Sequence, residues 1–167
     1  MLAARQWPEQ VGAVVTIAST PCFVTRSDWP EAMPQAEFDQ FTQALACDEQ
    51  RVRKRFMALM VSGDAQPRAA MHTLKACSRG PVPSPEALRI TLGWLRSIDE
   101  RSFWSSARLP ALHLFGEQDA LVRSGTPQAL GLDDGRYRVL EGVSHWPRGQ
   151  QAERIGSMIK RFWEQSL

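Results

Sequence analysis

Residues 111–119 read Ala-Leu-His-Leu-Phe-Gly-Glu-Gln-Asp, a mainly apolar run that ends in a polar turn, and this pattern limits the fold class that the chain can adopt. A run of this length bounded by a glycine is typical of a β-strand. Residues 136–140, Arg-Tyr-Arg-Val-Leu, predict a second strand, and the loop after them reaches His145. The pattern predicts two strands that each end in a loop with a titratable side chain.

Elements on either side of these two strands complete an α/β pattern. Val11 to Ala18 is a β-branched run that predicts a buried parallel strand, and Leu2 to Trp7 predict the end of a helix that Pro8 stops. A closing helix is expected from Gln151 to Glu164, where apolar residues recur at helical spacing. We therefore predict the α/β class, with parallel strands and flanking helices.

A long segment between the first and second predicted strands is helical in character. Four apolar patterns with helical spacing follow one another there, and Ser84 before Pro85 predicts the N-cap and first residue of the fourth helix. No strand pattern interrupts them, so we expect a helical insertion that covers the sheet as a lid. The expected division is an α/β core at residues 1–29 and 100–167, with the lid at 30–99.

Composition and charge argue against several classes of protein. The chain has 167 residues, of which 43% are hydrophobic and 23% charged, as in a soluble globular domain. Its net charge of +2 does not favour a nucleic-acid partner, and no apolar run approaches the ~20 residues of a membrane span. The three widely spaced cysteines form no C-x-x-C pair, which predicts reduced thiols in a cytoplasmic protein and no metal site.

Two titratable residues are predicted to lie at the carboxyl ends of neighbouring strands, where ligands bind in open parallel sheets. Asp119 follows one strand and His145 follows the next. A hydrolase needs a carboxylate that orients an imidazole, and an imidazole that takes a proton from a nucleophile and returns it to the leaving group. His72 falls in a predicted lid helix and His113 inside a strand, so neither has that placement.

Five short motifs carry a resemblance to a known family. They are Val15-Thr16-Ile17-Ala18-Ser19-Thr20-Pro21-Cys22-Phe23, Asp28-Trp29-Pro30, Arg55-Phe56-Met57-Ala58-Leu59, Leu114-Phe115-Gly116-Glu117-Gln118-Asp119-Ala120-Leu121-Val122 and Ser144-His145-Trp146-Pro147. With them the chain resembles α/β-hydrolase-fold carboxylesterases, and among these the pimeloyl-[acyl-carrier protein] methyl ester esterases of biotin synthesis. The resemblance implies the C-terminal part of an α/β-hydrolase fold that carries a helical lid.

The resemblance also implies a catalytic triad in the chain order Ser, Asp, His. Asp119 and His145 match its second and third members, but no G-x-S-x-G elbow occurs in the 167 residues. We therefore expect that the chain begins after its nucleophile, lacks the oxyanion-hole amides and is inactive alone. Ser19, Ser144 and Cys22 are not expected to replace the nucleophile, because no strand-to-helix elbow or neighbouring base is predicted for them.

Further roles come from the resemblance alone. Arg51, Arg55 and Arg68 match lid positions that bind the acidic acyl carrier protein, and Phe56 and Leu121 match residues that line the acyl chain. Taken without the resemblance, such charges are also typical of a solvated helix face, and Phe56 of core packing. The expected partner is an acyl carrier protein that carries a pimeloyl methyl ester, and no metal or organic cofactor is implied.

Two alternatives remain open from the sequence. One is a different α/β hydrolase that acts on small esters without a protein partner, in which case the three arginines do not affect activity. The other is a non-catalytic fragment, or a half that associates with a separate N-terminal half. A fragment of this kind is expected to expose a sheet edge at Val11 to Ala18.

Overall fold

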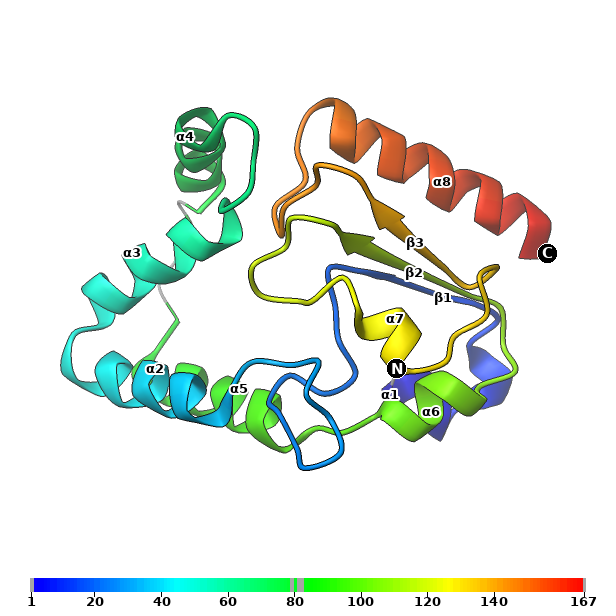
Figure 1. Cartoon of the computed structure of the whole chain (residues 1–167), viewed down its shortest axis with the longest axis horizontal. Coiled ribbons are helices and arrows are strands. Elements are labelled where there is room, and N and C mark those ends of the chain that lie inside the picture. Colours follow the sequence, from blue (N-terminus) through cyan, green and yellow to red (C-terminus); the bar gives the residue numbers. More distant parts are fainter. Residues whose placement is uncertain (1, 79, 81–82, 167) are drawn as a thin grey trace.

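A computed structural model, which describes residues 2–78, 80 and 83–166, shows a three-stranded sheet with a group of helices beside it (Figure 1). The strands β1 (Val14–Ile17), β2 (Ala111–Gly116) and β3 (Tyr137–Leu140) lie in the order β1-β2-β3, and both pairs are parallel. This confirms the predicted α/β class. Because the strands are parallel, their carboxyl ends meet at one edge of the sheet.

Helices cover both faces of the sheet. The elements of this core are α1 (Leu2–Gln6), the 3-10 helix η1 (Pro8–Gln10), α6 (Arg101–Ser106), α7 (Thr126–Ala129) and α8 (Gln150–Ser166). On one face Leu112 and Leu114 of β2 pack with Ile155 of α8, and on the other Phe115 packs with Trp104 of α6. All six residues of β2 are buried, so β2 is the centre of the core.

The first strand differs from the prediction. A buried strand was expected from Val11 to Ala18, but β1 covers only Val14–Ile17, its side chains are half-buried, and Ile17 is 41% exposed. The physical reason is its place in the sheet, since within the described residues β1 pairs with β2 alone and its other edge is open.

The first four helices after β1 are those that the sequence predicts between residues 30 and 99. They are α2 (Gln35–Cys47), α3 (Glu49–Met60), α4 (Pro67–Cys77) and α5 (Pro85–Ser97). We call them the helical insertion; they stand to one side of the sheet (Figure 1). The Ser84 hydroxyl accepts a hydrogen bond from the Ala87 N–H, which confirms the predicted N-cap. The boundaries of the division at 29/30 and 99/100 stay a prediction, as does the role of a lid.

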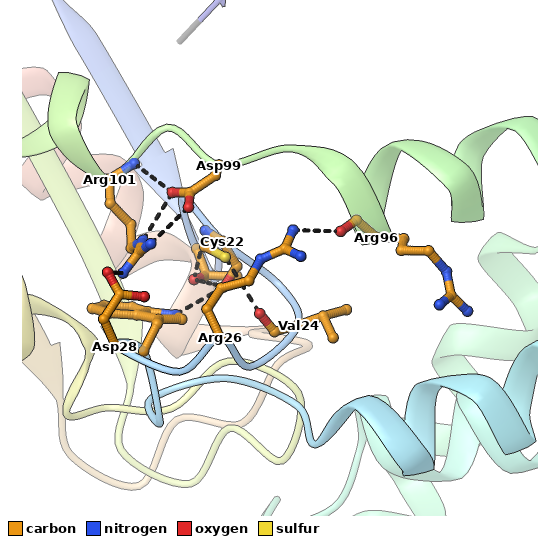
Figure 2. A network of polar contacts seen from close by, with 9 residues as sticks. Cys22, Val24, Arg26, Asp28, Arg96, Asp99 and Arg101 are labelled. Carbon is orange, nitrogen blue, oxygen red and sulfur yellow. Dashed lines mark hydrogen bonds and ion pairs between the residues drawn. The ribbon is translucent and has the colours of Figure 1, made fainter.

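A polar network connects the segment before the insertion, residues 22–28, to the segment after it, residues 96–101 (Figure 2). Cys22 and Asp99 form an antiparallel bridge. Arg101 binds Asp99 at 2.7 Å and Asp28 at 3.1 Å, and its hydrogen bonds hold the pKa values of both carboxyls below their usual range. Arg26 donates to a backbone carbonyl at the C-terminal end of α5 at 2.7 Å. The base of the insertion is thus fixed to the core.

His113 is a buried structural residue, in keeping with its position inside a strand. Its ring stacks on Trp104 with the ring centroids 4.2 Å apart, and its Nδ1 lies 2.9 Å from the Thr16 hydroxyl on β1. Burial, and secondly the positive charge of Arg136, lower the pKa of His113 to about 4. The imidazole is therefore neutral in the folded protein near pH 7.

None of the described helices is both long and apolar enough to cross a lipid bilayer.

His113 should make stability depend on pH. Unfolded chains protonate a histidine near pH 6.5, whereas the folded chain resists protonation until about pH 4, so acidification through this window should favour unfolding, by at most about 1.4 kcal/mol per pH unit. Urea unfolding at several pH values should show a steeper loss for the natural chain than for His113→Asn. An equal pH dependence of the two proteins would contradict the burial argument.

Candidate functional site

The edge where the strands end brings Asp119 and His145 into contact. Oδ2 of Asp119 lies 2.8 Å from Nδ1 of His145, although the residues are 26 positions apart. The Asp119 side chain is fully buried, and the His145 side chain is 19% exposed. The sequence predicted this proximity from the order of the strands; the catalytic roles of the two residues stay a prediction.

The loop after β2 fixes the Asp119 carboxylate from its other side. Oδ1 accepts hydrogen bonds from the backbone N–H groups of Leu121 at 2.8 Å and Val122 at 2.9 Å. Such hydrogen bonds to an ionised acceptor are stronger than neutral ones. With both oxygens engaged, the carboxylate presents Oδ2 to the imidazole in one orientation.

Gly116, the last residue of β2, permits the close approach of the two loops. A Cβ atom at this position would lie 2.4 Å from the carbonyl oxygen of Val143 and 3.0 Å from that of Ser144. The His145 loop therefore passes directly over the backbone of Gly116. The N–H of Gln118 donates to the Val143 carbonyl at 2.9 Å and locks this arrangement.

A second hydrogen bond joins the same loops. Oε2 of Glu117 accepts from the Gly142 N–H at 3.0 Å, and this bond holds the pKa of the Glu117 carboxyl below its usual range. Gly142 has φ +66°, a left-handed conformation that glycine adopts at little cost. The turn that leads from β3 to His145 thus requires a glycine and is anchored to the Asp119 loop.

The geometry suits proton transfer. With Nδ1 engaged by Asp119, the other ring nitrogen, Nε2, has no hydrogen-bond partner among the residues that the structure describes. The Ser144 side chain is buried, and the Ser19 hydroxyl donates to the carbonyl of Ile17 at 2.9 Å. Among the described residues, neither serine is hydrogen-bonded to His145. No cluster of three His, Cys, Asp or Glu side chains in the described part of the chain could hold a metal ion.

The predicted acyl-chain residues lie in different places. Phe56 lines an apolar cavity of about 580 Å³ inside the helical insertion, and Trp146, the neighbour of His145, lines it too. Leu121 is buried in the Asp119 loop and is not one of the residues around this cavity. The structure therefore does not bring Phe56 and Leu121 together in one pocket.

The predicted carrier-binding residues are on the surface of the insertion. Arg51 and Arg55 lie one helical turn apart on α3, Arg68 lies in the first turn of α4, and all three are exposed. None of them forms an ion pair with any residue for which the structure gives a position.

Sequence reasoning missed the residues that hold the loops in place. Gly116 had a signal, because it stands at the junction of the strand and the acidic loop. Asp64 of the insertion binds Arg148, three residues after His145, but the two are 84 positions apart and no local pattern pairs them.

The chain is similar to known proteins in sequence and in fold. No protein-family model matches the chain. It is 42% identical over 116 residues to the pimeloyl-[acyl-carrier protein] methyl ester esterase of Klebsiella pneumoniae subsp. pneumoniae, covering 69% of this chain and 45% of that protein. It is 31% identical over 163 residues to the esterase of the same name from Serratia marcescens, covering 96% of this chain and 64% of that protein.

Solved structures agree on the fold. A hydrolase from Oleispira antarctica superposes with a TM-score of 0.76 at 14% identity, over 96% of this chain and 59% of that one. An esterase from Exiguobacterium antarcticum gives a TM-score of 0.73 at 16% identity, over 91% and 57%. At these identities the likeness concerns the fold alone. In both kinds of comparison the chain spans less than two thirds of its relatives.

Substitution of Gly116 tests the close approach of the loops. Gly116→Ala should lower the free energy of unfolding by about 1–3 kcal/mol, because its Cβ must push the His145 loop away. The matched control is Gly156→Ala in α8, where nothing lies within 4 Å of the added Cβ and a gain of about 0.5–1 kcal/mol is expected. Urea unfolding measures both, and a Gly116→Ala protein as stable as the natural chain would contradict the account.

Proposed function

We propose that this chain, which is part of an α/β-hydrolase fold, supplies the Asp119–His145 pair of a serine carboxylesterase. The observation that carries the proposal is the 2.8 Å contact between the buried carboxylate and the imidazole at the carboxyl ends of parallel strands. The sequence similarity to pimeloyl-[acyl-carrier protein] methyl ester esterases supports the same class of reaction.

In the proposed reaction His145 moves the proton. Asp119 accepts a hydrogen bond from Nδ1–H, so the neutral imidazole has its lone pair on Nε2. Nε2 takes the proton of a serine hydroxyl as the serine oxygen attacks the ester carbonyl, and Asp119 stabilises the imidazolium. Nε2 then gives the proton to the departing methoxide oxygen, so that methanol leaves, and a water molecule releases the acid from the acyl-serine by the same steps.

The attacking serine is proposed to lie outside these 167 residues, in a G-x-S-x-G elbow. Two observations support this. The sequence contains no such motif, and the chain spans 64% of the Serratia marcescens relative. In this proposal the 167 residues alone do not turn over substrate, and the added segment provides both the nucleophile and the oxyanion-hole amides.

The proposed substrate is the methyl ester of pimeloyl-[acyl-carrier protein], and the proposed location is the cytoplasm. The names of the relatives support the substrate class. The exposed Arg51, Arg55 and Arg68 provide positive charge for an acidic carrier protein, and the apolar cavity at Phe56 provides space for an acyl chain. In this role the helical insertion acts as a lid over the strand ends, and Leu121 contributes to the wall near Asp119.

A fusion tests the proposed division of the catalytic groups. Residues 1–167 are joined behind the segment of the Serratia marcescens esterase that precedes the matched region. We expect the fusion to release methanol from pimeloyl-[acyl-carrier protein] methyl ester, and the 167 residues alone to release none. His145→Ala should lower kcat about 10⁶-fold and Asp119→Asn about 10⁴-fold, as in other serine hydrolases. Full activity of the His145→Ala fusion would rule out its role as the base.

Charge reversal separates the carrier-dependent esterase from a hydrolase of small esters. In the same fusion, Arg51→Glu with Arg55→Glu should raise KM for the carrier-bound ester about tenfold or more, because like charges then face the acidic carrier. Hydrolysis of free dimethyl pimelate should not change. Arg154→Glu on the exposed surface of α8 is the control. If the double variant processes both substrates normally, the carrier protein does not bind this face.

A further inference from the structure

The turn between α3 and α4, residues 61–66, contacts both loops of the candidate site. We propose that three positioning residues hold His145 against Asp119. They are Asp64 of this turn and Trp146 and Arg148 of the His145 loop. In this proposal the insertion supports the Asp119–His145 pair, in addition to its proposed role as a lid over the strand ends. The inference rests on the proposed function only in giving the pair a catalytic purpose.

The first contact is with the Asp119 loop. Gly63 has φ +81°, and a Cβ atom on it would lie 2.6 Å from both the Cβ and the carbonyl oxygen of Gln118. The backbone of the turn thus packs directly on the residue that precedes Asp119. Gln118 is also the residue whose N–H binds the Val143 carbonyl, so the turn presses on the point where the two loops are joined.

The second contact is an ion pair with the His145 loop. Oδ1 of Asp64, whose side chain is 4% exposed, lies 3.1 Å from Nη2 of Arg148. The same guanidinium nitrogen donates to the Gln66 carbonyl at 3.3 Å, and the Gln66 N–H donates to Asp64. Removal of Arg148 would leave the buried Asp64 carboxylate without its charged partner, which strongly destabilises its present position. Arg148 therefore ties the turn to the chain just after His145.

The third contact is apolar. Trp146, directly after His145, packs against the cluster formed by Val61, Ala70 and Leu74 where α3 and α4 meet. A tryptophan that packs on such a cluster buries a large apolar area, and this stabilises the position of the loop that carries it. His145 is thus followed by two anchors, Trp146 in the apolar cluster and Arg148 on Asp64.

The opposite side of the His145 loop is held by α8. The N–H of Gln151 donates to the Arg148 carbonyl at 3.1 Å, and its side-chain amide donates to the Gly142 carbonyl at 3.1 Å. These bonds hold the backbone of the loop at Gly142 and Arg148, whereas the side chains of Trp146 and Arg148 hold the loop from the side of the insertion. The orientation of the imidazole between these supports depends on both.

The test uses the Nδ1 proton of His145, which reports the hydrogen bond to Asp119 without any substrate. In the ¹⁵N-labelled chain we expect Asp64→Asn and Arg148→Met to speed exchange of this proton with water at least about tenfold, a factor that corresponds to 1.4 kcal/mol. The matched control is Asp39→Asn, which breaks the ion pair of Asp39 with Arg96 between α2 and α5, away from both loops. Its exchange rate should stay within about twofold of the natural chain.

The outcomes are decisive in both directions. If Asp64→Asn and Arg148→Met have the circular dichroism of the natural chain and the same exchange rate, the positioning role is wrong. If either variant does not fold, Arg148→Lys decides, because it keeps the charge but loses the guanidinium geometry: faster exchange supports the inference and an unchanged rate overturns it. An inactive esterase fusion with a protected Nδ1 proton would count against the proposed function and leave the positioning role intact.

Discussion

The close approach of two loops over Gly116 is the constraint on which the candidate site depends. A residue with a side chain at this position would place its Cβ 2.4 Å from the Val143 carbonyl, and the His145 loop would have to move outward. Only with the loop in its present place do Val143 and Gly142 reach their partners on the Asp119 loop. The 2.8 Å contact between Asp119 and His145 follows from this backbone packing.

The proximity of Asp119 and His145 could be predicted from the sequence because parallel strands carry their carboxyl ends to one edge. The four helices of the insertion were also predictable, since periodicity and the Ser84 cap are local signals. The short helices α6 and α7 have no periodicity to detect. The expected burial of β1 was wrong because burial depends on a neighbouring strand rather than on the residues of β1 itself.

Contacts between distant segments lay beyond sequence reasoning. Asp64 and Arg148 meet only because the insertion folds back onto the carboxyl ends of the strands. In the sequence, this ion pair looks the same as two solvent-exposed charged residues. Phe56 and Leu121 are both apolar, and the hydrophobic periodicity of the sequence does not show whether they line the same cavity. Phe56 lines the cavity of the insertion, whereas Leu121 is buried in the Asp119 loop. The insertion therefore contacts the site through its turn more directly than through Phe56.

The tautomer of His145 in the natural chain tests the central claim most directly, namely that the packing of the two loops holds Asp119 and His145 together as a proton-transferring pair. Histidine ¹⁵N chemical shifts at neutral pH distinguish a ring protonated on Nδ1 from one protonated on Nε2. The account predicts that His145 carries its proton on Nδ1, facing Asp119, with Nε2 unprotonated. A ring protonated on Nε2, or an averaged signal like that of a free histidine, would contradict it.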